Sequence, residues 1–367
     1  MFDFQYDYKQ VLAHSIHSYP AKFPALVPKQ IIQNHLKKKN QVILDPFSGC
    51  GTTLLEGLIN GHNVIGNDIN FIGNLIASVK TTIYSKNHIN NAYKHCDNFS
   101  DCKVYSSNRI VDFYNIDHWF QKNVQKEICF ILDRIDEEKS MRLQNLFKAS
   151  LSEIIIKVSN QDSDTRYEAI KKNIKNGQTV NLYLEKLHEN IKKVSDLSSR
   201  IDPKLTCKIL CQDTRKLKDV KSNSVDLIVT SPPYANTYDY YLYHKHRMNW
   251  LGYDFSFSKS LEIGSRLQFS SKKDDISIWE EDINSFLKEF KRVSKNRSVI
   301  CLVIGDSVVD KKLFKANECI YELSKQLNFK HLYSSSESLS KNTKKFNHKW
   351  RTKLDKKEHV IVLQVAK

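Results

Sequence analysis

The sequence predicts an α/β protein whose sheet is mostly parallel and is interrupted in the chain by a helical insertion. Three observations lead to this prediction. A short apolar run at 41–44 is followed by a glycine-containing turn and an apolar helical pattern, the order strand, turn, helix. A second apolar run at 225–230 ends at two consecutive prolines. Between these two runs, residues 84–200 consist largely of helical patterns, so we expect 1–83 and 201–367 to form one sheet domain.

The composition indicates a polyanionic partner. The 367 residues include 57 Lys and Arg against 41 Asp and Glu, a formal net charge of +16, which is typical of proteins that bind nucleic acid. A Lys- and Asn-rich compositional bias of the source would explain part of this excess. The eight cysteines form no Cys-x-x-Cys pair, so we expect reduced thiols and no metal site. No apolar run is long enough for a signal peptide or a membrane span, and we expect a cytoplasmic protein.

The first strong motif follows the strand at 41–44. Residues 45–53 read Asp-Pro-Phe-Ser-Gly-Cys-Gly-Thr-Thr, and a helix then runs to Asn60 and Gly61. Gly49 and Gly51 allow the backbone to approach a ligand closely, and the helix start supplies free N–H groups. The motif lacks the Lys of a phosphate-binding loop, which argues against a triphosphate. The acidic Asp45 instead favours a ligand that carries an ammonium group.

The next strand, 62–65, ends in Gly66, Asn67 and Asp68. An acidic residue at the end of the second strand, about 20 residues after the glycine turn, is typical of a site that binds a ribose diol. A surface Asp in a turn is the alternative. Upstream, prolines at 20, 24 and 28 keep the chain extended before a helix expected at 28–38.

The insertion, 84–200, contains three helical patterns, at 119–135, 143–158 and 180–194. Between the last two, residues 160–166 are polar and predict a loop, which either contacts substrate or is exposed to solvent. The insertion is also a candidate for target recognition.

The second strong motif follows the strand at 225–230, where the chain reads Ser231-Pro232-Pro233-Tyr234. The prolines cannot donate to a sheet ladder and hold the chain extended. Carbonyl and hydroxyl oxygens at Ser231 and Pro232 are thus available to accept hydrogen bonds from an amine, and Tyr234 offers a ring to a planar base. Two acceptors on the hydrogens of a base amine would favour the form that attacks a methyl donor. A strand followed by a plain Pro-Pro turn is the alternative.

Residues 238–250 interleave aromatic and basic side chains, which suits a nucleic-acid surface or a half-buried amphipathic helix. Downstream we expect helices at 279–293 and 316–327 and strands at 299–304, 329–333 and 359–365. Residues 341–357 carry eight Lys and Arg against one Asp, which favours a basic loop that lies on phosphates, although a solvated loop has the same pattern. The candidate DNA-binding residues are Tyr238, Tyr241, Lys245, Arg247, Arg266, Lys344, Lys345, Lys349 and Arg351.

The two motifs resemble those of S-adenosylmethionine-dependent amino-methyltransferases. Residues 45–52 resemble their cofactor-binding motif, Ser231-Pro-Pro-Tyr their catalytic motif, and His17 to Phe23 the segment that packs on the methionine end of the cofactor. This resemblance implies a Rossmann-like class I sheet of seven strands, with Asp68 at the ribose and Asp213 at the adenine. It implies the catalytic residues Ser231, Pro232, Pro233 and Tyr234. It implies the cofactor-binding residues Tyr19, Lys22, Phe23, Asp45, Pro46, Phe47, Ser48, Gly49, Gly51, Thr52, Asp68, Ile69, Asp213 and Thr214.

In this family the Ser-Pro-Pro-Tyr version is associated mostly with cytosine-N4, and the Asn or Asp version with adenine-N6. The resemblance therefore implies an enzyme that methylates the N4 amine of cytosine in double-stranded DNA, in restriction–modification, with a cognate restriction endonuclease as a possible partner. No Pro-Cys dipeptide occurs, so the covalent cysteine route to C5-methylcytosine lacks its nucleophile. The alternatives are adenine-N6 methylation, an RNA base-amine methyltransferase and a binding module without catalysis. The intact Gly49, Gly51 and Pro-Pro-Tyr argue against the last.

Overall fold

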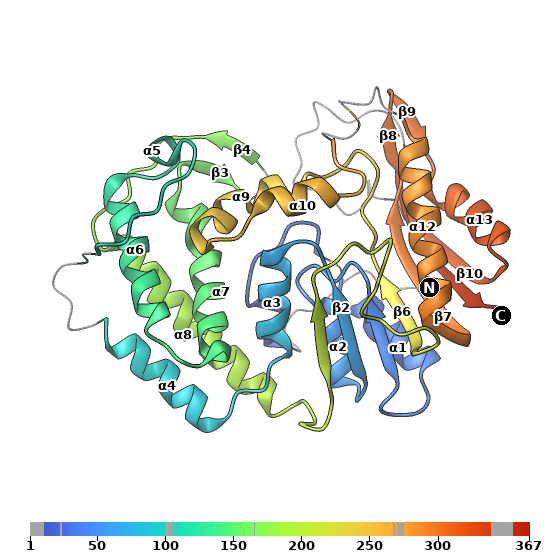
Figure 1. Cartoon of the computed structure of the whole chain (residues 1–367), viewed down its shortest axis with the longest axis horizontal. Coiled ribbons are helices and arrows are strands. Elements are labelled where there is room, and N and C mark those ends of the chain that lie inside the picture. The colour runs from blue at the N-terminus through green and yellow to red at the C-terminus, as the bar shows by residue number, and fades with distance from the viewer. Residues whose placement is uncertain are drawn as a thin grey trace.

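The computed structural model describes residues 11–367 except 23, 100–104, 106, 165, 267–268, 270–274 and 339–354. Its main feature is a sheet of seven strands in the order β10-β11-β7-β6-β1-β2-β5. Only β11 is antiparallel to its neighbours, β7 and β10, and the other pairs are parallel. The predicted mostly parallel, Rossmann-like sheet is thus confirmed (Figure 1). The strands are β1 (Val42–Asp45), β2 (Asn63–Asn67), β5 (Cys207–Leu210), β6 (Val225–Thr230), β7 (Ser294–Gly305), β10 (Phe329–Ser338) and β11 (Lys357–Val365).

Side chains that alternate along the strands divide the sheet's core between its two faces. In β1, Ile43 belongs to one apolar cluster and Leu44 to the other, and in β6 the neighbours Leu227 and Ile228 divide in the same way. Helices cover both faces, as a parallel sheet requires, because its central strands are apolar on both sides. One face packs against α1 (Leu26–His35), α2 (Thr52–Ile59) and α3 (Phe71–Thr81), and the other against α12 (Ser277–Val293) and α13 (Ala316–Gln326).

The insertion packs against the sheet domain and shares its core. Its helices contribute buried residues, among them Leu146, Phe147 and Leu187, to the same apolar cluster as Leu54 and Val79 of α2 and α3. The boundary predicted at 84 and 200 therefore separates two stretches of sequence whose apolar core is continuous. The helices of the insertion are α4 (Lys86–Asp97), α5 (Ile116–Trp119), α6 (Lys122–Asp136), α7 (Met141–Val158) and α8 (Gln178–Ser198).

The segment predicted as a polar loop at 160–166 is instead part of a hairpin, with β3 (Gln161–Ser163) antiparallel to β4 (Arg166–Ala169). The prediction was wrong because the periodicity of so short a polar strand is too weak to be seen. A second hairpin, β8 (Ser307–Val309) and β9 (Lys312–Phe314), and a short 3-10 helix, η2 (Leu12–Ser15), complete the minor elements.

Two helices cross from the insertion towards the sheet, α9 (Tyr240–Leu251) and α10 (Phe255–Leu261), as Figure 1 shows. None of the helices in the described ranges is long and apolar enough to cross a membrane. Among the same residues, no group of three or more His, Cys, Asp or Glu side chains is placed to hold a metal ion.

Candidate active site

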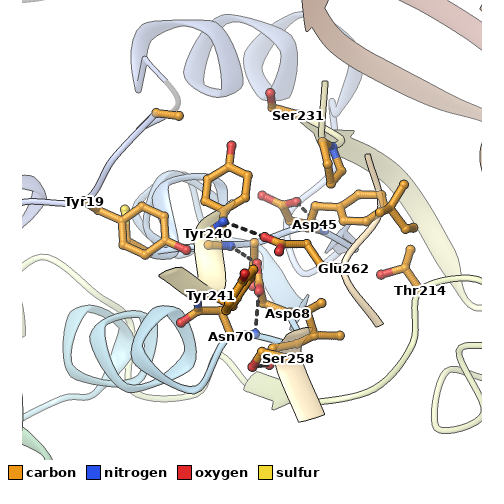
Figure 2. Close-up of a pocket in the computed structure, with 18 of the residues that line it drawn as sticks. Tyr19, Asp45, Asp68, Asn70, Thr214, Ser231, Tyr240, Tyr241, Ser258 and Glu262 are labelled. Carbon is orange, nitrogen blue, oxygen red and sulfur yellow. Dashed lines mark hydrogen bonds between the residues drawn. The ribbon is translucent and has the colours of Figure 1, made fainter. Parts of the chain in front are cut away.

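A cavity lies where the carboxyl ends of β1, β2, β5 and β6 meet, the edge at which open α/β sheets bind ligands. Its volume is about 960 Å³ when the part open to solvent is included. Loops after these strands form its floor, and residues of α9, α10 and the following loop also line it (Figure 2). We call the lining residues from Tyr240 to Ile263 the roof.

Most residues predicted from the two motifs lie around this one cavity. Ser231 and Pro233 line it, whereas Pro232, Tyr234, Pro46 and Gly51 do not. Phe23 lies outside the described residues. The lining residues predicted to bind cofactor are Tyr19, Lys22, Asp45, Phe47, Ser48, Gly49, Thr52, Asp68, Ile69, Asp213 and Thr214.

The glycine turn adopts the backbone conformation that the motif predicts. Gly49 and Gly51 have φ of 46° and 78°, in the left-handed region that favours glycine. A Cβ on Gly51 would lie 2.8 Å from the Cβ of Ala77, so this glycine lets α2 pack closely on α3. A Cβ on Gly49 would lie 3.3 Å from the Tyr19 ring at the cavity wall. Gly49 thus keeps the cavity clear of side-chain atoms, and Gly51 sets the position of the turn.

Two carboxyl groups, the buried Asp45 and the partly buried Asp68, lie at the ends of β1 and β2. Asp68 accepts the N–H groups of Gly49 and Asn70, at 2.7 and 2.8 Å. Asp45 accepts the Thr230 hydroxyl at 2.7 Å, which ties the end of β1 to the end of β6. Burial raises the pKa of each carboxyl to about 6, against these hydrogen bonds, which favour the charged form. Each Asp68 oxygen uses one lone pair on the backbone and has another for a ligand.

The loop after β5 is also fixed by hydrogen bonds. Asp213 is paired with Arg215, whose Nε lies 2.9 Å from Asp213 Oδ1, and Arg215 in turn bonds Asp282 at 2.7 Å. Thr214 donates its hydroxyl to the Pro46 carbonyl at 2.7 Å. Asp213 therefore reaches the cavity as part of an ion-pair network rather than as an isolated carboxylate.

The Ser-Pro-Pro-Tyr segment leaves β6 beside the glycine turn, because β1 and β6 are parallel neighbours. Trp279 Nε1 donates to the Pro233 carbonyl at 3.1 Å, and the Tyr234 hydroxyl donates to Glu358 Oε1 at 2.7 Å. The Tyr234 ring lies against Gly305, where an added Cβ would be 2.5 Å from a ring carbon. These contacts hold the segment rigidly, and Ser231 lies at the edge of the cavity's lining (Figure 2).

The wall at Tyr19 is joined to the insertion by a polar network. Ser18 donates its N–H to Glu153 at 2.7 Å, and His17 bonds the Ser152 hydroxyl at 3.0 Å. The Tyr19 ring stacks on His244 of α9 with centroids 4.9 Å apart. Burial lowers the pKa of His17 to about 4, so this histidine is neutral in the network. The insertion thereby fixes one wall of the cavity.

Lys22 is a second residue of that wall. Its ammonium donates to the His14 carbonyl, and burial lowers its pKa to about 8, with Lys80 adding to the shift. Lys22, which the sequence predicts to pack on the methionine end of the cofactor, is therefore itself held by a backbone carbonyl.

The predicted DNA-binding residues fall into three groups. Tyr238, Tyr241 and Lys245 are half-buried and Arg266 is exposed. Tyr241 also lines the cavity, under the ammonium of Lys259 at 5.6 Å. Four others lie outside the described residues, namely Lys344, Lys345, Lys349 and Arg351.

Arg247 is a correction to the sequence prediction, because it is fully buried. Its guanidinium bonds Asp164 of the β3–β4 hairpin and the Ser152 carbonyl of α7, the latter at 3.0 Å. The basic and aromatic residues of α9 were assigned to a nucleic-acid surface together, but this side of the helix faces the insertion. Periodicity within one helix does not distinguish its two faces when both carry cations and rings.

Sequence reasoning missed the roof. Tyr240, Ser258, Leu261, Glu262 and Ile263 line the cavity but belong to no motif. Glu262 Oε1 accepts the Tyr240 N–H at 2.6 Å, while its other carboxyl oxygen is buried without a hydrogen-bond partner. Burial raises the pKa of Glu262 to about 8, and Asp239 and Asp68 add to the shift. Asn70, also missed, follows Asp68 so closely that the motif itself could have indicated it.

Comparison with known proteins finds a family model that matches part of this chain and relatives of low sequence identity. Residues 4–71 match a family model described as DNA methylase. The Type II methyltransferase M.MvaI of Kocuria varians is 25% identical over 379 residues, which cover 88% of this chain and 83% of that protein. The Type II methyltransferase M.MjaII of Methanocaldococcus jannaschii is 23% identical over 393 residues, covering 82% and 73%.

Two solved structures give weak overall matches. A SAM-dependent methyltransferase from Methanosarcina mazei has a TM-score of 0.36 and 12% identity, covering 95% of this chain and 99% of that one. TrmN from Thermus thermophilus has a TM-score of 0.38 and 10% identity, covering 96% and 52%. The fold assignment therefore rests on the strand order itself.

The residues of the cavity fit S-adenosylmethionine, the cofactor that the sequence motifs predict. The molecule carries a sulfonium and an ammonium, and the cavity offers three carboxyl groups, from the buried Asp45 and the partly buried Asp68 and Glu262. The buried Ser48 hydroxyl has no hydrogen-bond partner among the described residues and lies on the lining. The activity that these findings support is that of a methyltransferase.

Proposed function

We propose that this protein transfers a methyl group from S-adenosylmethionine to the N4 amine of cytosine in double-stranded DNA, as the modification enzyme of a restriction–modification pair. The single observation that carries the proposal is that the glycine turn after β1 and the Ser-Pro-Pro-Tyr segment after β6 reach one cavity. The match to a DNA methylase model and the Type II methyltransferase relatives support DNA as the substrate. The net charge of +16 favours the same substrate.

In this proposal the residues after β1, β2 and β5 hold the cofactor. Asp68 binds the ribose, Asp213 accepts from the adenine amine, and Asp45 and the backbone of the glycine turn surround the methionine part with Tyr19 and Lys22. Asp68 is suited to its role because the Gly49 and Asn70 N–H groups fix both its oxygens before a ligand arrives. When bound, the cofactor supplies an electrophilic methyl group.

The residues after β6 hold the target amine. The Ser231 hydroxyl and the Pro232 carbonyl accept its two hydrogens, so that the nitrogen lone pair points at the methyl carbon. With the cofactor held by the residues after β1, β2 and β5, its methyl group would pass to this nitrogen, the S–C bonding pair would remain on sulfur, and the amine would lose a proton to solvent. A base inside a duplex cannot reach this site, so we infer that the cytosine leaves the stack, at a cost of a few kcal/mol.

Tyr234 is the stacking platform for that base in our proposal. Its hydroxyl is bonded to Glu358 and its ring lies on Gly305, so its orientation is preset. A ring held in place loses little conformational entropy on stacking.

Regions outside the cavity supply the DNA contacts. Tyr238, Lys245 and Arg266 lie on or beyond the roof, and we propose that they meet the DNA with the basic segment 341–357. The helical insertion, 84–200, and the region 235–280 are the two candidates for sequence recognition.

The test is product analysis. Unmethylated genomic DNA is incubated with the protein and methyl-labelled S-adenosylmethionine, digested to nucleosides and analysed by mass spectrometry. We expect label in N4-methylcytosine. Label in N6-methyladenine would overturn the base assignment and keep the site, whereas label only in tRNA or rRNA, tested in parallel, would overturn DNA as the substrate.

A further inference from the structure

Glu262 is the roof residue whose chemistry the two motifs leave unused. It follows α10 and its carboxyl enters the cavity, where it lies between Tyr240 and Asp68 in Figure 2. It is one of three carboxyl groups that line the cavity with a raised pKa, and the only one of these that does not follow a strand of the sheet.

Only one of the two carboxyl oxygens of Glu262 has a hydrogen-bond partner among the described residues. Oε1 accepts the Tyr240 N–H at 2.6 Å and so caps the start of α9. Oε2 is buried and has no partner among the described residues. Leaving a buried polar atom unpaired is costly, and such atoms in native proteins commonly meet a ligand or an ordered water. A cap alone would not require the second oxygen to enter the cavity.

The surroundings of Oε2 limit what this ligand group can be. A sulfonium carries no N–H or O–H and cannot satisfy an unpaired oxygen, and our proposal places the ammonium with the methionine part, at Asp45 and the glycine turn. Asp68 lies on the floor of the same cavity and, with Asp239, adds to the raised pKa of Glu262. Two facing carboxyl groups, one of them readily protonated, can both accept from and donate to hydroxyl groups. A vicinal diol presents two hydroxyls side by side and fits such a pair.

We propose that Glu262 is a second cofactor-contacting carboxyl, which binds one hydroxyl of the ribose diol from the roof while Asp68 binds the other from the floor. This inference rests on the proposed assignment of Asp68 to the ribose. It gives the roof a role in binding: α9 and α10 complete the cofactor site. Glu262 joins the ribose, at Oε2, to the first turn of α9, where Oε1 accepts the Tyr240 N–H.

The test measures affinity without DNA, by calorimetry, for S-adenosylmethionine and for its 2′-deoxy and 3′-deoxy analogues. We expect wild-type protein to lose about tenfold affinity on loss of either hydroxyl. We expect Glu262→Ala to bind the full cofactor about tenfold more weakly than wild type. Compared with its own affinity for the full cofactor, this variant should bind only one of the two deoxy analogues still more weakly. Glu262→Gln keeps an oxygen for the Tyr240 N–H, so it reports on the ligand contact if the Ala variant unfolds. Its NH2 group can donate to a hydroxyl but cannot accept from one, so we expect the loss for that one analogue to be smaller than in wild type.

Asp254→Asn is the matched control. Asp254 caps α10 by accepting the Ser256 N–H at 2.8 Å and does not line the cavity, so its variant should bind all three ligands as wild type does. Equal losses with both analogues in wild type and in both Glu262 variants would overturn the inference and reduce Glu262 to a helix cap. Wild-type protein that binds all three ligands equally would instead overturn the ribose assignment of Asp68. Neither outcome bears on the methylated base, which product analysis decides separately.

Discussion

The floor and the roof of the cavity are built in different ways. On the floor, each carboxyl is fixed by groups at neighbouring strand ends: Asp68 by Gly49 and Asn70, and Asp45 by Thr230. In the roof, Glu262 is held by backbone N–H groups of the first turn of α9, at Tyr240 and Tyr241. The helices around it depend on contacts with the insertion, such as the bond from Arg247 to Asp164. The floor is therefore preorganised by the sheet, whereas the roof depends on long-range packing. Variants in the two regions should fail differently.

The largest effect is expected from Asp68→Ala on the floor. The change removes the proposed ribose contact and leaves the N–H groups of Gly49 and Asn70 without their acceptor, so we expect cofactor affinity to fall by about 100-fold. Calorimetry with S-adenosylmethionine measures this, and Asp68→Asn, which keeps one acceptor, should lie between. An unchanged affinity would show that Asp68 does not contribute to cofactor binding and would contradict the preorganised floor.

Gly305→Ala should affect the transfer step and spare the floor. The new Cβ would meet the Tyr234 ring at 2.5 Å, and the ring must shift from its bond to Glu358. We expect kcat to fall by about 30-fold, because a displaced platform misaligns the amine, with cofactor affinity unchanged. The measurement is steady-state kinetics beside calorimetry. Equal losses in both quantities would show that the two motifs are not separable.

The pH dependence of cofactor binding should follow the protonation of two floor carboxyl groups, Asp45 and Asp68. Their pKa in the free protein is about 6, above the ordinary value of 3.8, so protonation stabilises the free folded protein at low pH and this contribution is lost as the pH rises through 6. A cationic ligand binds the ionised forms. We expect affinity to weaken as the pH falls below 6, by up to about tenfold per pH unit for each proton taken up. An affinity that strengthens on acidification would contradict this assignment.

The smallest effect is expected outside the cavity, at the exposed Arg266. If Arg266 contacts one phosphate, Arg266→Ala should lower the slope of log affinity for DNA against log salt by about 0.9. Filter binding at several salt concentrations measures the slope. Arg292→Ala is the control and should leave the slope unchanged, because Arg292 is already bonded to Glu289 and lies at the amino ends of β6 and β7, opposite the cavity.

The floor could be predicted from sequence because its residues follow strands that periodicity reveals. Asp45, Asp68 and Ser231 each come directly after an apolar run, and parallel strands bring their carboxyl ends to one edge. The roof could not be predicted in this way. Glu262 is far in sequence from any strand end. Arg247 is buried because it bonds Asp164 of the β3–β4 hairpin, some 80 residues earlier in the chain. Tertiary packing determines where such side chains lie, and the local sequence pattern carries no information about that packing.

The most direct test of the central claim, that one cavity joins a cofactor-binding floor to a separate transfer segment, is the effect of Ser231→Ala. Cofactor affinity and the single-turnover rate of methyl transfer to DNA are measured on the same preparation. We expect the rate to fall by about 100-fold, because an acceptor on the amine is lost, and the affinity to stay within about twofold of wild type. A normal rate would remove Ser231 from the transfer step and contradict the account.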